Sequence, residues 1–175
     1  MSQSPKPALL RERNDQWLRG HNSGPNIKGH LILIAEDSEA DIFFLLRVMQ
    51  QAGVMNPIFV LRDGAEAFAY LQGTGRYANR SIFPLPGIVL LDLKMPGVDG
   101  FEILRWTRQQ GSLQNTLMVA VSSYDGVYGI NLAYETGADT FLSKPLTKVD
   151  VLNLISAFDE YWELASSCAT NWFIE

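Results

Sequence analysis

The sequence predicts an α/β fold, a doubly wound parallel sheet of five strands with helices on both faces. From residue 30 onward, short apolar runs alternate with segments of helical periodicity, which is typical of repeated βα units. The runs are apolar at nearly every position, as in strands buried on both faces of a parallel sheet. Charged residues follow several of these runs. Because parallel strands end at one edge of the sheet, where such folds bind ligands, these charges are expected to converge there.

The first two βα units are defined by apolar spacing and by turn residues. A strand over 31–35 precedes a helix over 38–51, and a strand over 58–61 precedes a helix over 64–72. The apolar face of the first helix, its stop signal and the residue that opens the second strand are Ile42, Leu45, Leu46, Met49, Gly53 and Pro57. Residues 73–86 form a long loop rich in Gly, Arg, Asn and Pro.

The same alternation predicts three further units. Their strands are expected over 88–91, 117–121 and 140–142, and their helices over 101–110, 128–136 and 148–165. A turn over 95–100 contains Pro and Gly and separates the third strand from its helix. The last helix carries an apolar face of Val151, Leu154, Ile155, Phe158 and Trp162.

Both ends of the chain are expected to lie outside the domain, which is placed at residues 30–165. Residues 1–29 contain three prolines and several Asn and Gly, and they are expected to form a flexible N-terminal arm with a short helix over 8–18. His21 and His30 are interpreted as ordinary polar residues. Residues 166–175 form a C-terminal tail, in which Cys168 is a small apolar filler and Trp172-Phe173-Ile174 can dock elsewhere.

Bulk composition excludes several classes of protein. The 175 residues are 47% apolar, which suits one domain with a substantial core, and the net charge of −5 argues against nucleic-acid binding. No apolar run approaches the roughly 20 residues of a membrane-spanning helix, and no signal peptide is visible. The single cysteine cannot form an internal disulfide, which fits a reducing compartment. We therefore expect a cytoplasmic protein without an appended DNA-binding domain.

Four of the five predicted strands are followed by chemically informative residues. These are Glu36-Asp37 after the first strand, Asp92 after the third, Ser122 after the fourth and Lys144-Pro145 after the fifth. Each has an ordinary explanation when taken alone: an acid pair favours a helix N-terminus, and Asp, Ser and Lys-Pro are common in turns and loops. Their coincidence at one end of four strands favours a shared site.

These positions resemble the receiver domains of two-component response regulators, over residues of about 30 to 162. The stretch from Asp92 to Gly100, Gly137-Ala138-Asp139 and Phe141 extend the resemblance. It implies a flavodoxin-like, three-layer (βα)5 fold with strand order 2-1-3-4-5. The long loop over 73–86 further resembles the single-domain, phytochrome-associated subgroup. Ser122 stands where Thr is commoner, and the hydroxyl is kept.

The chemistry expected of this site is phosphoryl acceptance by Asp92, assisted by Lys144 and Ser122. Phosphoryl transfer depends mainly on positioning and on neutralising charge, so carboxylates that hold Mg²⁺ beside the nucleophile suit it. We assign Asp37 and Asp92 as direct ligands of Mg²⁺. The resemblance implies two more, the main-chain carbonyl of Lys94 and Glu36 through water. It also implies that Ser122 and Phe141 change conformation when Asp92 is phosphorylated, although from the sequence alone Phe141 is equally consistent with an ordinary core residue.

The expected partners are a sensor histidine kinase or a phosphotransfer protein, with no nucleic acid and no membrane. In the resembled family, signalling uses the face of the fourth helix, fifth strand and fifth helix, here residues 128–136, 140–142 and 148–165. A homodimer through this face is a hypothesis. It rests on the aromatic residues there, Tyr128, Tyr134, Phe158, Tyr161 and Trp162.

Two alternatives remain open at this point. A phosphatase of the haloacid dehalogenase type also uses a strand-end Asp and Mg²⁺, but it needs a second Asp two residues later, where this chain has Lys94. A receiver-like scaffold that is never phosphorylated is the other alternative, although it would have little reason to keep the full set of acid, hydroxyl and lysine. An enzyme with a separate substrate is therefore not the preferred interpretation.

Overall fold

The predicted parallel sheet is confirmed. The computed structural model describes residues 30–123 and 126–165. Its five strands are all parallel and lie in the order β2-β1-β3-β4-β5. They are β1 (Ile32–Ala35), β2 (Ile58–Leu61), β3 (Ile88–Asp92), β4 (Leu117–Ser122) and β5 (Thr140–Ser143). This is the flavodoxin-like order expected from the sequence.

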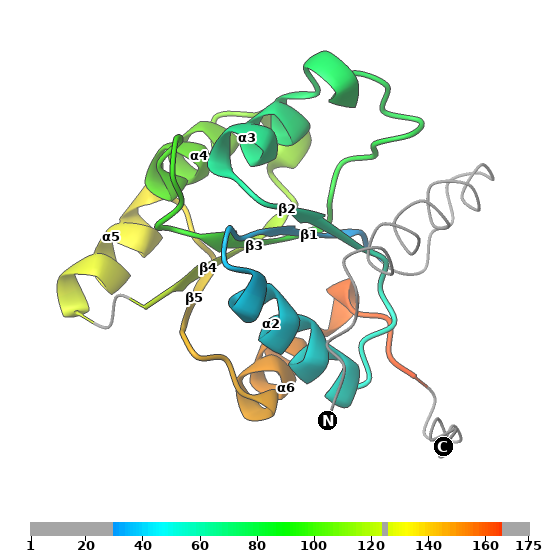
Figure 1. Ribbon diagram of the computed structural model, residues 1–175, viewed down its shortest axis with the longest axis vertical. Helices are drawn as coiled ribbons and strands as arrows, with labels where there is room; N and C mark the ends of the chain where they lie inside the picture. The colour runs from blue at the N-terminus through cyan, green and yellow to red at the C-terminus, as the bar shows by residue number, and fades with distance from the viewer. Residues whose placement is uncertain (1–29, 124–125, 166–175) are drawn as a thin grey trace.

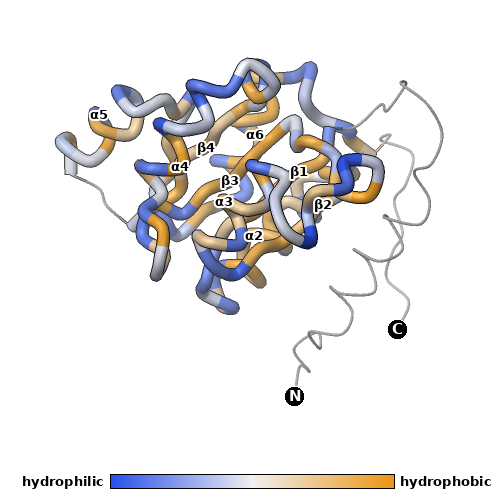
Figure 2. The backbone as a smooth tube through the Cα atoms, turned by 90° about the horizontal axis from the view of Figure 1, so that it is seen from above, coloured by the Kyte–Doolittle hydropathy of each residue, from blue (hydrophilic) through white to orange (hydrophobic). Residues whose placement is uncertain are grey.

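Helices cover both faces of the sheet, which gives three layers (Figure 1). They are α2 (Glu39–Gln51), α3 (Gly64–Gln72), α4 (Gly100–Thr107), α5 (Val127–Thr136) and α6 (Lys148–Ala157), with short 3₁₀ turns η1 (Gly75–Tyr77), η2 (Gly111–Leu113) and η3 (Asp159–Tyr161). One core cluster joins the sheet to α2 and α6, and the other joins it to α3, α4 and α5. The central strands are hydrophobic (Figure 2), except at the last residues of β3 and β4, which are Asp92 and Ser122.

Strand register brings the ends of the central strands to one level. Ala35 pairs with Leu91, and Leu91 pairs with Ala120, so β1, β3 and β4 end together at the same edge. Ser122 pairs with Ser143, which places the end of β5 beside them. The residues at and just after these ends therefore share one rim, as the sequence predicted.

The last helix is shorter than predicted, because it ends at Ala157 and not at residue 165. Phe158 leaves the helical conformation with φ −139° and ψ 53°, and the chain then runs antiparallel to the segment that follows α2. The Met55 N–H donates to the Glu163 carbonyl at 2.7 Å, and the Ala165 N–H donates to the Gly53 carbonyl at 2.9 Å. Tertiary backbone pairing thus replaces the expected helical turns. The third predicted helix likewise stops at Thr107 and not at residue 110.

The long loop after α3 is held by one arginine and a group of aromatic rings. The Arg80 guanidinium donates to the carbonyls of Tyr70, Leu71 and Phe83 at 2.7 to 3.3 Å. The first two are carbonyls of the last turn of α3, where the Tyr70 carbonyl also accepts from the Gly73 N–H. The Tyr70 ring packs against Phe83, and its buried hydroxyl donates to the Pro84 carbonyl at 2.9 Å. Burial raises the pKa of Tyr70, so the hydroxyl stays a donor.

Several predictions concern residues beyond the described part of the chain. The helix over 8–18, His21, Cys168 and Trp172-Phe173-Ile174 all lie outside residues 30–123 and 126–165, so the arm and tail stay predictions. His30 is described: it is exposed, and its ring lies 5.2 Å from that of Tyr161. Within the described residues, no helix is long and apolar enough to cross a membrane.

Asn56 ties the end of the domain to its beginning, and we expect Asn56→Ala to lower the free energy of unfolding by about 2–4 kcal/mol. Its buried amide donates to the His30 and Tyr161 carbonyls at 2.8 and 2.9 Å and accepts from the Glu163 N–H at 2.7 Å. Without this side chain, the carbonyls of His30 and Tyr161 and the N–H of Glu163 each lose a hydrogen bond. Urea unfolding would measure the loss. Asn153→Ala, on the exposed side of α6, is the control; a loss no greater than the control's would contradict this prediction.

Candidate functional site

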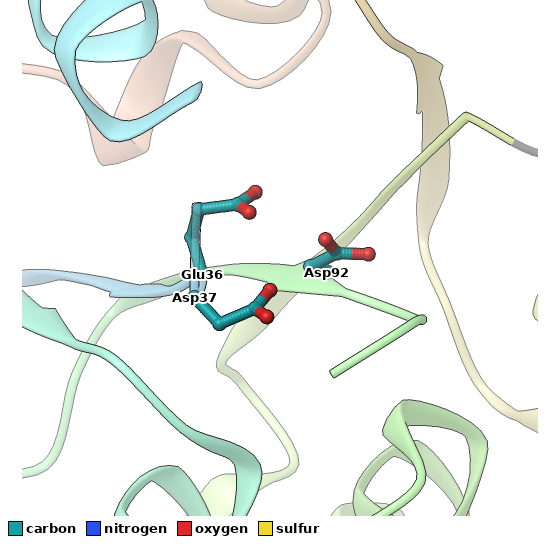
Figure 3. Close-up of side chains that lie close together, drawn as sticks. All are labelled: Glu36, Asp37 and Asp92. Carbon is teal, nitrogen blue, oxygen red and sulfur yellow. The ribbon is translucent and has the colours of Figure 1, made fainter. Parts of the chain in front are cut away.

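Three carboxylates converge at the carboxyl edge of the sheet (Figure 3). Glu36 and Asp37 follow β1, and Asp92 ends β3. One oxygen from each lies within 4.8 Å of the others. Glu36 and Asp92 are buried, at 3% and 6% exposed, whereas Asp37 is exposed. The three acids predicted from the sequence to share a site are therefore together, with one of them open to solvent.

The Lys144 ammonium lies among the acids. It contacts Glu36 Oε2 at 2.5 Å, Asp92 Oδ2 at 2.7 Å and Asp41 Oδ2 at 2.9 Å. Burial alone would lower the pKa of Lys144, but its hydrogen bonds to Asp92, Glu36 and Asp41 outweigh that effect and raise the pKa. The lysine therefore stays charged throughout the physiological range.

Glu36 responds to burial in the opposite sense. Desolvation raises the pKa of Glu36, and the negative charge of Asp92 adds to the effect, while hydrogen bonds from Lys144 and from the Ser38 N–H oppose it. Ser38 is also the N-cap of α2, and its hydroxyl accepts from the Asp41 N–H at 3.3 Å. The acid pair is thus fixed where a strand turns into a helix.

Asp92 is held by both of its oxygens. Oδ1 accepts from the Lys94 N–H at 2.8 Å, and Oδ2 accepts from the Lys144 ammonium. The start of α4 approaches this strand end closely, because a Cβ on Gly100 would lie 2.8 Å from the Asp92 carbonyl oxygen. Asp99 caps α4 through a 3.1 Å bond from the Phe101 N–H. The residues after Asp92 therefore form a tight turn that fixes the carboxylate.

The two predicted switch residues lie on neighbouring strands. Ser122 is fully buried at the end of β4, and Phe141 in β5 is half-buried against the core beneath α3, α4 and α5. The Lys144 N–H donates to the Ser122 carbonyl at 2.9 Å, which joins the two strand ends directly beside the acids. Ser122 therefore belongs to the same rim as Lys144.

A family model described as "Response regulator receiver domain" matches residues 32–156. The chain belongs to this family. The fold resemblance proposed from the sequence is thereby confirmed, and the described geometry is that of a receiver domain.

Three relatives illustrate the similarity. Response regulator Rcp1 of Synechocystis is 30% identical over 132 residues, which cover 75% of this chain and 88% of Rcp1. The solved Mn(2+)-bound form of Rcp1 has a TM-score of 0.63 at 28% identity and covers 78% of this chain and 99% of that one. The bacteriophytochrome response regulator AtBRR has a TM-score of 0.68 at 32% identity, with 81% and 100% covered. The phosphorylated cyanobacterial phytochrome response regulator RcpA has a TM-score of 0.61 at 29% identity, with 79% and 99% covered.

The donor set of this receiver domain fits a small, hard cation. Mg²⁺ prefers oxygen ligands at about 2.0–2.1 Å in an octahedron, which puts neighbouring ligand oxygens about 3 Å and opposite ones about 4 Å apart. One carboxylate oxygen from each of Glu36, Asp37 and Asp92 lies within 4.8 Å of the others, somewhat wider than that spacing, so binding of the cation would draw them together. Asp37 is exposed, so the site is open to water on one side, as Mg²⁺ requires.

Asp41 was missed by the sequence analysis. It occupies the first turn of α2, four residues after Asp37, where an acid has an ordinary explanation in the helix dipole. Nothing in the periodicity distinguishes it from Glu39, which lies in the same turn and pairs with Arg62 at 2.5 Å. Only the folded chain brings Asp41 within 2.9 Å of Lys144.

Glu36 should make the metal-free protein less stable as pH rises. Its pKa in the folded state is raised above 4.5, so the folded protein binds this proton more readily than the unfolded chain. We therefore expect the unfolding free energy of the native chain to fall, relative to Glu36→Gln, as pH rises from 4.5 through the raised pKa.

Urea unfolding in a chelating buffer between pH 4 and 8 would measure this difference. Lys144 stays protonated across this range, so its titration does not contribute. Glu39→Gln, at an exposed position of the same segment, is the control. A native chain that gained stability over Glu36→Gln with rising pH would show that the sign is wrong.

Proposed function

We propose that this receiver domain accepts a phosphoryl group on Asp92 from a sensor histidine kinase or phosphotransfer protein and signals by protein contact. The observation that carries the proposal is the environment of Asp92, a buried carboxylate bound by a lysine and a main-chain N–H and flanked by two further acids. The family match and the phosphorylated state of the relative RcpA support it.

The proposed reaction is a transfer of one phosphoryl group to an Asp92 oxygen. A bond forms between that oxygen and phosphorus, while the bond from phosphorus to the donor breaks and its electron pair leaves with the donor. Asp92 becomes an acyl phosphate. Lys144, now paired with the carboxylate, is placed to pair with a phosphoryl oxygen, and the Ser122 hydroxyl to donate to another.

Mg²⁺ is the proposed cofactor, and it would neutralise charge on the transferring group. Asp37 and Asp92 would bind it directly, with the Lys94 main-chain carbonyl as a third protein ligand and Glu36 acting through water. The acidic cluster and the Mn(2+)-bound form of Rcp1 support a divalent cation. The phosphatase alternative is less favoured, because the chain belongs to the receiver family and its second motif acid is absent at Lys94.

The partner kinase is proposed to be of the phytochrome-associated kind. Relatives that match over most of this chain include response regulators named for bacteriophytochrome, phytochrome and red-light signalling. The loop after α3, whose length suggested this subgroup, is an ordered part of the domain built around Arg80. Phytochrome-associated histidine kinases are therefore the first kinases to test as phosphoryl donors.

The predicted acceptor is tested by chemical phosphorylation. We expect the native chain, incubated with Mg²⁺ and a small acyl-phosphate donor, to gain the mass of one phosphoryl group, and Asp92→Asn to gain none. Intact-mass spectrometry would measure both. Asp99→Asn is the matched control, because asparagine still caps α4 and the acceptor is intact. A native chain that never labels, or an Asp92→Asn chain that labels equally, would sink the proposal.

Output is proposed to use the face formed by α5, β5 and α6, with Ser122 and Phe141 carrying the change. This face is less aromatic than expected, since Trp162 is buried and Phe158 and Tyr161 are packed against the core. Both helices nevertheless carry exposed apolar side chains, namely Val127, Tyr128, Tyr134, Val149 and Leu152. These suit a homodimer or another protein contact.

A homodimer through this face should form on activation. At tens of micromolar, we expect the light-scattering mass to rise toward that of two chains when a phosphoryl mimic is added, and Leu152→Lys to prevent the rise. Ile82→Lys, an exposed apolar position in the loop after α3, is the control. A mass of one chain in both states would contradict the homodimer and leave phosphoryl acceptance untouched.

A further inference from the structure

Lys144 contacts a third carboxylate, that of Asp41, which is not one of the proposed metal ligands. Asp41 lies in the first turn of α2, and its Oδ2 is 2.9 Å from the Lys144 ammonium. Its side chain is 43% exposed, whereas those of Glu36 and Asp92 are 4% and 7% exposed. Asp41 thus contacts the lysine from the solvent side of the site, whereas Glu36 and Asp92 contact it from the buried side.

An ammonium group has three N–H donors, and all three have carboxylate partners here. Two of those partners, Glu36 and Asp92, also belong to the acidic cluster that a cation would occupy. The lysine and a divalent cation therefore compete for the same oxygens. Asp41 is the partner whose charge remains available to the lysine after a cation has engaged the other two.

We propose that Asp41 is a positioning residue that acts through Lys144. It holds the ammonium on the α2 side of the site, so that Glu36 and Asp92 can turn to a cation without leaving the lysine unpaired. This inference rests on the proposed function, because it concerns the same cation site. It adds a role for a carboxylate that neither binds the cation nor accepts the phosphoryl group.

The proposal separates two effects of removing the Asp41 charge. Any lost negative charge near the site weakens cation binding slightly through space, and this effect does not depend on Lys144. Loss of the lysine's anchor weakens cation binding only while the lysine is present, because the unanchored ammonium then holds Glu36 and Asp92 more firmly. A double-mutant cycle distinguishes the two.

The experiment measures the Mg²⁺ dissociation constant by calorimetric titration of the full chain. We expect Asp41→Asn to raise it about fivefold, within the coupling found between contacting groups. Lys144→Met should lower it, because the competing cation is gone. In the Lys144→Met background, the further change Asp41→Asn should alter it by less than about twofold, the size of a through-space effect at an exposed charge.

Two further variants serve as controls for this experiment. Glu39→Gln removes an acid from the same helical turn, but that acid pairs with Arg62 and not with Lys144, so the dissociation constant should stay within about twofold of native. Asp41→Glu keeps the charge and should restore most of the native affinity. Circular dichroism would confirm that each variant is folded.

An Asp41→Asn effect of equal size in both backgrounds, or no effect in either, would overturn the positioning role while leaving the cation site intact. A native chain that binds no Mg²⁺ would overturn the cation site, and with it this inference. The two failures are therefore distinguishable.

Discussion

The contact on which the site depends is the shared ion pairing of Lys144. Lys144 comes directly after β5. Its ammonium contacts the carboxylates of Glu36 after β1, Asp41 in the first turn of α2 and Asp92 at the end of β3. Removing charged groups from water is costly, and each buried carboxylate here is tolerated because the lysine lies beside it. With Asp37 included, the acids still outnumber this cation. Lys144 therefore holds the strand ends together but neutralises only part of the negative charge of the acids. The remaining negative charge favours the binding of a second cation.

The sheet supplies the geometry that this pairing needs. Because β1, β3 and β4 are buried on both faces, a shift of register would move buried side chains to the opposite core, so the strand ends are fixed relative to one another. The rim also gains from α2, whose N-terminus favours negative charge and receives Glu39 and Asp41 in its first turn. Sheet register and helix dipole thus act on the same group of acids.

The fold and much of the site could be predicted from sequence, because both depend on local signals. Unbroken apolar runs identify buried parallel strands, and the residues at their ends are then neighbours by topology. Three features could not be predicted this way. The helical period continues past Ala157, but backbone pairing with residues 53–55 ends the helix. Arg80 fixes the conformation of a loop whose composition indicates no regular structure. Asp41 resembles any acid at the start of a helix until folding brings Lys144 beside it.

The link between the proposed acceptor and the proposed output face is short. Lys144 bonds to Asp92 through its side chain and to the Ser122 carbonyl through its backbone N–H, so the ends of β3, β4 and β5 are joined at one residue. A phosphoryl group on Asp92 would draw the ammonium off the carboxylate, and that displacement begins one residue after β5. Phe141 lies in that strand, half-buried beneath α5. Because packed cores respond in discrete steps, a change at this strand end would reach the exposed helices through Phe141 more readily than through the fully buried central strands.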